Sequence, residues 1–162
     1  MDVLAHPNGI YLSAAQGWLE LGNWTEALAE LEQIGPEWRE HPDVLQVRWQ
    51  VAVKAERWPE ALAVAESLCR TAPDSPFGWI HRSYCLHELH RTQEAWDALF
   101  PLAERFPREW LISYNLACYA CQLGNLEEAK SWLARAVKLG DRTEIERLAE
   151  QDGDLKPLFQ KP

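Results

Sequence analysis

The sequence contains neither a long hydrophobic run nor a cluster of basic residues. A membrane-spanning helix needs about 18 or more apolar residues in succession, and no such stretch is present. The formal net charge is −9, from 16 Lys and Arg against 25 Asp and Glu. Because nucleic acid backbones are bound by clustered Lys and Arg, this balance argues against a nucleic acid partner. We therefore expect a protein that binds neither membranes nor nucleic acids.

Export and catalytic signals are also missing. The first ten residues, MDVLAHPNGI, lack the basic cluster and apolar core of a secretory signal, so we expect a cytoplasmic protein. Its four cysteines are then expected to be free thiols. The chain has no Gly-rich phosphate loop and no nucleophile elbow, and its five His residues are not paired with acids at a fixed spacing. We expect no enzyme activity and no cofactor.

An internal repeat is the main feature that is present. The Glu-Ala pairs Glu26-Ala27, Glu60-Ala61, Glu94-Ala95 and Glu128-Ala129 are each 34 residues apart. On both sides of each pair, apolar residues recur every three or four positions, as in amphipathic helices. The breaks between the two helical patterns fall at Gly22, Glu56, His90 and Gly124. The period predicts four helix hairpins in a single domain, over residues 9–41, 42–75, 76–109 and 110–142.

Each Glu-Ala pair has a physical explanation that needs no catalytic role. Asn23 and Asn125 are good N-cap residues, and the Glu three positions later would complete a capping box. An acid in the first helical turn also interacts favourably with the helix dipole. The Ala beside each Glu suits a point where the two helices of a hairpin cross closely. We interpret the pairs as structural.

The period and several signature residues resemble the tetratricopeptide repeat family. The third unit supplies Trp79, Ala95, Leu99 and Pro107 at signature positions. It departs from the signature in having Arg82, Ser83 and Leu86 where Leu, Gly and Tyr are usual. The resemblance covers residues 9–142 and implies an all-α, right-handed superhelical solenoid. The segments YNLACYACQLG and AEQDGDLKPLF also resemble the C-terminal ends of bacterial repeat proteins, which implies a bacterial source.

Residues 143–162 are expected to form a capping helix and tail. Thr143 and Glu146 form a capping pair, and Gly153 and Pro157 would end the helix. A stack of repeats exposes an apolar face at its end unless an atypical element covers it. We expect this helix, with Leu155, Leu158 and Phe159 behind it, to cover the last hairpin.

The resemblance places binding on the concave face, which the first helix of each hairpin lines. Counting from the core aromatic positions gives the candidate groove residues Leu12, Gln16, Gln46, Gln50, Phe77, Ile80, Tyr84, His87, Tyr114, Asn115 and Cys118. This groove has a Gln-rich polar half and an aromatic half, which suits an extended segment or an amphipathic helix of a partner protein. The alternative is that Phe77, Ile80 and Tyr84 pack between neighbouring repeats.

Two arginines occupy equivalent positions 34 residues apart, Arg48 and Arg82. One interpretation is that they cover apolar surface and stack on Trp49 or Trp79. The other is that they present forked donors to an acidic partner. A carboxylate clamp of the kind found in some family members is disfavoured, because only Asn115 matches its residue pattern.

The expected function is a protein-interaction module or scaffold that holds a partner segment in the groove, with self-association open. One alternative is a small secretion-type chaperone that shields an apolar client segment. Another is a thiol or zinc protein that uses Cys118 and Cys121, with Cys85 or His87 completing the ligand set. The latter is disfavoured because both cysteines fall within a predicted helix rather than at its N-terminus.

Overall fold

The computed structural model describes residues 4 and 6–160, and within them the regular structure is helical, with no β-strand. The helices are α1 (Asn8–Glu20), α2 (Trp24–Glu32), α3 (Pro42–Lys54), α4 (Trp58–Thr71), α5 (Pro76–Glu88), α6 (Thr92–Leu99), α7 (Leu102–Arg105), α8 (Trp110–Gln122), α9 (Leu126–Leu139), α10 (Arg142–Gln151) and α11 (Lys156–Phe159), with a short 3-10 helix at Pro36–Trp38. The predicted all-α repeat of helix hairpins is confirmed.

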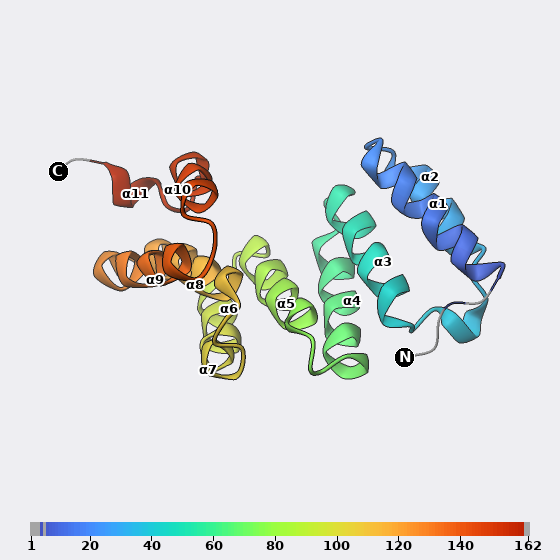
Figure 1. Cartoon of the computed structure of the whole chain (residues 1–162), viewed down its shortest axis with the longest axis horizontal. Coiled ribbons are helices and arrows are strands. Elements are labelled where there is room, and N and C mark those ends of the chain that lie inside the picture. Colours follow the sequence, from blue (N-terminus) through green and yellow to red (C-terminus); the bar gives the residue numbers. More distant parts are fainter. Residues whose placement is uncertain (1–3, 5, 161–162) are drawn as a thin grey trace. The chain divides into compact units, whose positions relative to one another are not determined.

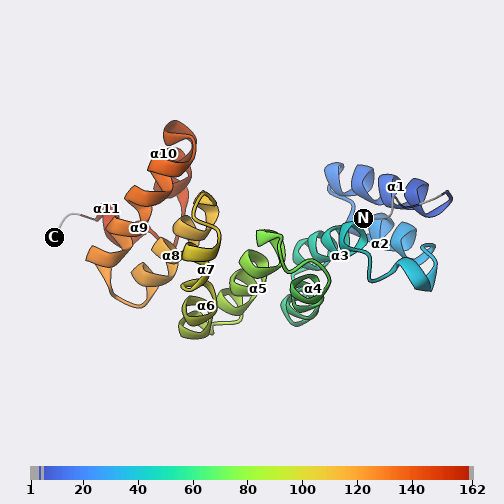
Figure 2. The same ribbon diagram turned by 60° about the horizontal axis from the view of Figure 1, so that its bottom comes forward.

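The chain divides into two compact units, unit 1 up to Gly78 and unit 2 from Trp79 onward. In unit 1, α1 packs on α2 and α3 packs on α4, as Figure 1 shows in blue, cyan and green. In unit 2, α8 packs on α9, and α9 also contacts α10 and α11, which Figure 2 shows in orange and red. The prediction of a single domain over the whole chain stays a prediction.

A left-handed residue closes each helix hairpin. Gly22, Glu56, His90 and Gly124 have φ values of 77°, 55°, 60° and 84°. The amide of the following residue donates to the carbonyl five positions back, from Asn23 to Trp18, Arg57 to Ala52, Arg91 to Leu86 and Asn125 to Ala120, at 2.8–2.9 Å. These bonds define the Schellman motif, which ends a helix and turns the chain. The predicted breaks are therefore confirmed as the hairpin turns.

The capping prediction is only half right. The side chain of Asn23 accepts a hydrogen bond from the Glu26 amide at 3.2 Å, whereas Asn125 makes no side-chain cap bond. The reciprocal bond from Glu26 to the Asn23 amide is not needed, because that amide donates to the Trp18 carbonyl in the turn. A capping box thus competes with the Schellman motif for the same donor, and the Schellman motif prevails.

The alanines of the four pairs occupy buried positions, and the glutamates do not. Ala27, Ala61, Ala95 and Ala129 are each fully buried, while the Glu beside each of them is exposed. This burial fits the predicted close crossing of two helices, where a larger side chain would force the backbones apart.

The second helix of the third hairpin is broken, which the repeat pattern did not predict. α6 ends at Leu99 and α7 begins at Leu102, with Pro101 between them. Proline has no amide hydrogen and its ring clashes with the preceding turn, so a helix is kinked or ended there.

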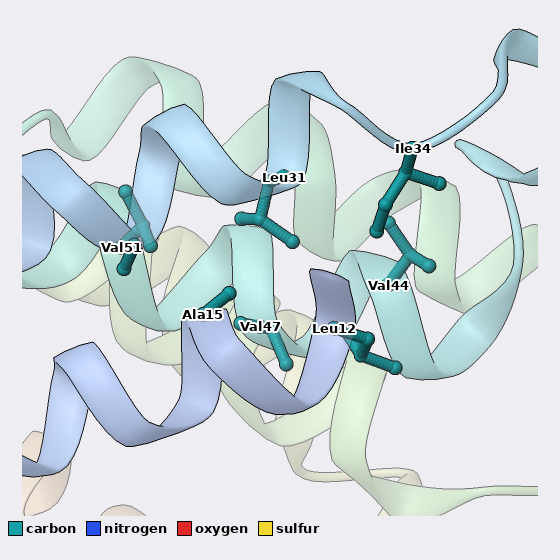
Figure 3. Packing of buried hydrophobic residues seen from close by; sticks show 8 residues of the cluster. Leu12, Ala15, Leu31, Ile34, Val44, Val47 and Val51 are labelled. Atoms are coloured by element: carbon teal, nitrogen blue, oxygen red, sulfur yellow. The ribbon is translucent and has the colours of Figure 1, made fainter. Parts of the chain in front are cut away.

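The core of unit 1 is made by the two hairpins together. Figure 3 shows Leu12 and Ala15 of α1 facing Val44, Val47 and Val51 of α3, with Leu31 and Ile34 closing the cluster. These side chains are at most 8% exposed. Burying a Leu, Ile or Val side chain contributes about 1.5–3 kcal/mol, so this cluster fixes how α1 and α3 pack.

In unit 2, α8 is the central helix. Ile112, Leu116, Ala117 and Ala120 of α8 have no exposed surface, and Tyr119 is 1% exposed. A helix that is apolar on every side is a buried helix, and the sequence of α8 has this character.

The capping helix forms, with corrections at both ends. α10 begins at Arg142 and its N-cap is Asp141, whose carboxylate accepts from the Glu144 amide at 2.9 Å, rather than Thr143. Pro157 does not end this helix but lies in the first turn of α11. Phe159, expected to cover the hairpin, is 52% exposed.

The turns make a stability prediction. A non-glycine residue in the left-handed region costs roughly 1–2 kcal/mol, and glycine avoids this cost. Glycine also gives the unfolded chain more conformational freedom, which cancels part of the gain. We expect His90→Gly to raise the free energy of unfolding by about 0.5–1 kcal/mol, measured by urea denaturation. The matched control is Gly124→Ala, which should lower it. A His90→Gly variant less stable than the parent would contradict the strained-turn interpretation.

Candidate partner-binding faces

The first helices of unit 1 present an open polar hollow. It has a volume of about 470 Å³ and is lined by Gln16, Leu19 and Glu20 of α1 and by Gln50 and Lys54 of α3. The lining residues repeat at intervals of three or four along each helix, so they share one side of it. We call this surface the unit 1 face. The two predicted glutamines, Gln16 and Gln50, lie together on it and are exposed.

The other two groove residues predicted for unit 1, Leu12 and Gln46, differ in how deeply they are buried. Leu12 is wrongly placed in the groove, because its side chain is 8% exposed and packs in the hydrophobic core. Gln46 is half-buried on α3, one turn before Gln50. A helical repeat pattern assigns a residue to one side of a helix, but the neighbouring helix decides whether that side is buried.

The predicted aromatic part of the groove is largely packed. Phe77 is half-buried and meets Trp49 edge-on, with ring centroids 5.7 Å apart. Ile80 is 3% exposed, so its assignment to an open groove is wrong. Tyr84 is half-buried, and burial together with a hydrogen bond to Glu88 and the charge of that carboxylate raises the pKa of its hydroxyl. For Phe77 and Ile80 the packing alternative fits.

In unit 2, the corresponding surface is covered by the chain itself. We call residues 152–158 the C-terminal segment, and the surface of α5 and α8 that it covers the unit 2 face. Asp152 Oδ2 accepts a hydrogen bond from the Tyr114 hydroxyl at 2.9 Å and a weaker one from the Cys118 thiol at 3.7 Å. Tyr114 and Cys118 are consequently 7% and 5% exposed.

Asp154 makes the second set of contacts. Its Oδ2 lies 2.9 Å from His87 Nε2, and its main-chain carbonyl accepts from Gln122 Nε2 at 2.8 Å. His87 Nδ1 lies 3.0 Å from the Thr92 hydroxyl, which orients the imidazole toward Asp154. The next residue, Leu155, is fully buried. The C-terminal segment is therefore anchored by two carboxylates and a main-chain carbonyl, and it carries one fully buried leucine.

Burial and negative charge govern the titration of this face. Burial raises the pKa of the Cys118 thiol well above its usual value, and the charges of Asp152 and Asp154 add to the effect. Burial also raises the pKa of Cys121 and of the Tyr114 hydroxyl. These groups keep their protons near neutral pH and act as hydrogen-bond donors. A reactive thiolate at Cys118 or Cys121 is therefore not supported.

The predicted zinc ligands do not converge. Among the described residues, the atoms close enough to share a metal ion belong to Cys118, Asp152 and Asp154, within 4.8 Å of one another, and not to Cys118 and Cys121 with a third residue. Metal binding there would require the Cys118 thiol to lose its proton, which its raised pKa opposes.

The two arginines have different environments. Arg48 Nη2 donates to the Leu31 carbonyl at 3.3 Å and to Glu32 Oε1 at 3.2 Å, so it ties α3 to the end of α2. The guanidinium over the Trp79 ring belongs to Arg105, at 5.6 Å. Arg82 is half-buried, and its charge contributes to a lowered pKa of Glu94, after the hydrogen bond from Arg91. Asn115 is half-buried on α8.

The comparisons with solved structures define the class of the fold. The chain is similar to a thermophilic TPR protein of Thermus thermophilus, with 20% identity and a TM-score of 0.77 over 94% of this chain and 81% of the other. It is also similar to MamA of Desulfovibrio magneticus RS-1, with 16% identity and a TM-score of 0.73 over 97% and 92% of the two chains. The fold is that of tetratricopeptide-repeat proteins.

No protein-family model and no curated protein matches the sequence. None of the helices in the described ranges combines the length and the apolar character needed to cross a bilayer.

Sequence reasoning missed Asp152, Asp154 and Gln122 as parts of the candidate site. The sequence assigns Gly153 only the role of a helix stop, and nothing in the local pattern marks the acids on either side of it as parts of a site. The donors come from residues 32–67 positions earlier in the chain, a separation that no local pattern reveals.

The contact between His87 and Asp154 predicts a pH dependence. Burial alone would lower the pKa of His87, but the hydrogen bond and charge of Asp154, with Glu88 and Asp152, outweigh burial and raise it. This stabilisation is complete below the unfolded-state pKa of about 6.5 and is lost as the pH rises through the higher folded-state pKa.

We therefore expect the free energy of unfolding of the parent to decrease as the pH rises from about 6 to about 9. This decrease should exceed that of His87→Gln by up to about 1 kcal/mol. Urea denaturation across this range measures the difference. Parallel pH profiles for the two proteins would show that the imidazolium does not hold Asp154.

Proposed function

We propose that this protein is a non-catalytic interaction module that holds a segment of a partner protein on the unit 1 face. The observation that carries the proposal lies in unit 2, where the first helices α5 and α8 already hold a segment of polypeptide by side-chain hydrogen bonds. The unit 1 face, built from first helices of the same repeat, carries an open hollow instead. A segment from another protein would fill it.

The lining of the hollow suits a polypeptide. The amides of Gln16 and Gln50 can each donate to and accept from a peptide backbone. Lys54 and Glu20 offer one charge of each sign at the same end, and Leu19 offers an apolar contact. Such a mixture of few polar groups and an apolar patch is typical of peptide recognition, and it favours binding over chemistry.

A second candidate is the chaperone role, in which an apolar client segment is shielded. One observation favours it, a hollow of about 550 Å³ in unit 2 lined partly by Leu133, Val137, Leu158 and the exposed Phe159. The lining also carries charges of both signs, from Lys130 and Arg142 and from Glu146 and Glu150. A client would need an apolar helix face flanked by both basic and acidic residues. A cytoplasmic location and the absence of a nucleic acid partner stay predictions.

Affinity capture from the source lysate with paired charge variants tests the main proposal. Lys54→Glu alters the unit 1 face, and Lys138→Glu makes the same charge change at an exposed position in the last turn of α9. We expect Lys54→Glu to bind specific partners at least about tenfold more weakly than the parent, as for the loss of a charge that is buried in an interface. Lys138→Glu should retain these partners. Equal capture by both variants and the parent would contradict the proposal.

A further inference from the structure

The unit 2 face and the C-terminal segment have complementary chemistry. The face contributes donors, namely the Tyr114 hydroxyl, the Cys118 thiol, the imidazole of His87 and the Gln122 amide. The segment contributes acceptors, two carboxylates and a main-chain carbonyl. These donors include no lysine or arginine, so the carboxylates are held by directed hydrogen bonds, which specify position more strictly than a single ammonium does.

The spacing of the two acids is set within the segment. The Asp154 amide donates to Asp152 Oδ1 at 2.9 Å, which shapes a tight turn and leaves Oδ2 of each carboxylate for the unit 2 face. A side chain added at Gly153 would meet no atom within 4 Å, so this middle position accepts other residues. Leu155 follows in a fully buried site. The recognised pattern is Asp-x-Asp-Leu.

We propose that the unit 2 face is a receptor site for Asp-x-Asp-Leu segments and that the C-terminal segment is its resident, displaceable ligand. The partner is a protein with an acidic segment of this pattern. The inference rests on the proposed function in one respect, the use of first-helix faces to hold a partner. It goes further by naming the ligand chemistry and a competing segment within the chain.

The way in which the segment is attached makes displacement feasible. Asp152 is an extended residue that follows the end of α10, so residues beyond it can leave the unit 2 face while α10 stays packed through Ile145 and Ala149. Asp152 and Asp154 are half-buried rather than enclosed. A tethered ligand has an effective concentration on the order of millimolar, so a free peptide competes well only when the resident contacts are weakened.

A labelled peptide with the sequence of residues 150–160, EQDGDLKPLFQ, is the probe. The full chain with Asp152→Asn and Asp154→Asn keeps the face and weakens the resident segment. By fluorescence anisotropy, we expect this variant to bind the peptide at least about tenfold more tightly than the parent does, as removal of a competing tether predicts. Adding Tyr114→Phe should reverse the gain, and a peptide with Asn in place of both Asp should bind at least about tenfold less tightly.

The control variant neutralises two exposed acids of α9, Glu127→Gln with Glu128→Gln, and should bind like the parent. Thermal melts show whether each variant is folded. If the folded Asp152→Asn, Asp154→Asn protein binds no more tightly than the parent, or binds the Asp and Asn peptides equally, the proposal is overturned.

A second measurement needs no variant. On addition of excess peptide to the parent protein, hydrogen exchange of the Asp154 and Leu158 amides should accelerate, because the turn that contains their hydrogen bonds is no longer packed on the unit 2 face and opens more often. Peptide binding without such acceleration would also overturn the proposal. Loss of partners with Lys54→Glu would still stand in that case, so a failure here is distinguishable from failure of the proposed function.

Discussion

The turn that closes each helix hairpin is the constraint on which the rest of the structure depends. A left-handed residue followed by a Schellman bond recurs at residues 22, 56, 90 and 124, and five positions after each a buried alanine lets the second helix cross the first closely. The turn takes up the amide that a capping box would have used. In each hairpin these two features determine which side of the first helix meets the second, and so which side is left to face a ligand.

The unit 1 face is open, whereas the unit 2 face is covered by the C-terminal segment. In unit 1 the face carries a polar hollow lined by residues of α1 and α3. In unit 2 the face is occupied by residues 152–158 through Asp152 and Asp154, and the neighbouring Leu155 is buried. One repeat design thus yields an open surface and a self-occupied one. The difference comes from the C-terminal segment, whose acids find side-chain donors on α5 and α8 rather than water.

Much of the architecture was predictable from the sequence, because the hairpin depends on local chemistry that recurs at a fixed period. The positions of Gly22, Glu56 and the buried alanines follow from that period. The break at Pro101 was not predicted, because the period describes only what the repeats share. The candidate site was less predictable. Leu12 and Ile80 lie on the predicted side of their helices but are buried by neighbours, and Tyr114 and Cys118 are buried by a segment more than 30 residues away. A helical pattern assigns sides, whereas long-range packing decides exposure.

The central claim is that the C-terminal segment lies on the unit 2 face in solution. Nuclear Overhauser spectroscopy of the isotope-labelled protein tests it most directly, because the Tyr114 hydroxyl lies 2.9 Å from the Asp152 carboxylate. Contacts from the Tyr114 ring protons to Asp152, and from Gln122 to Asp154, are the predicted result. Random-coil chemical shifts for residues 152–158 with no contact to α8 would contradict the account.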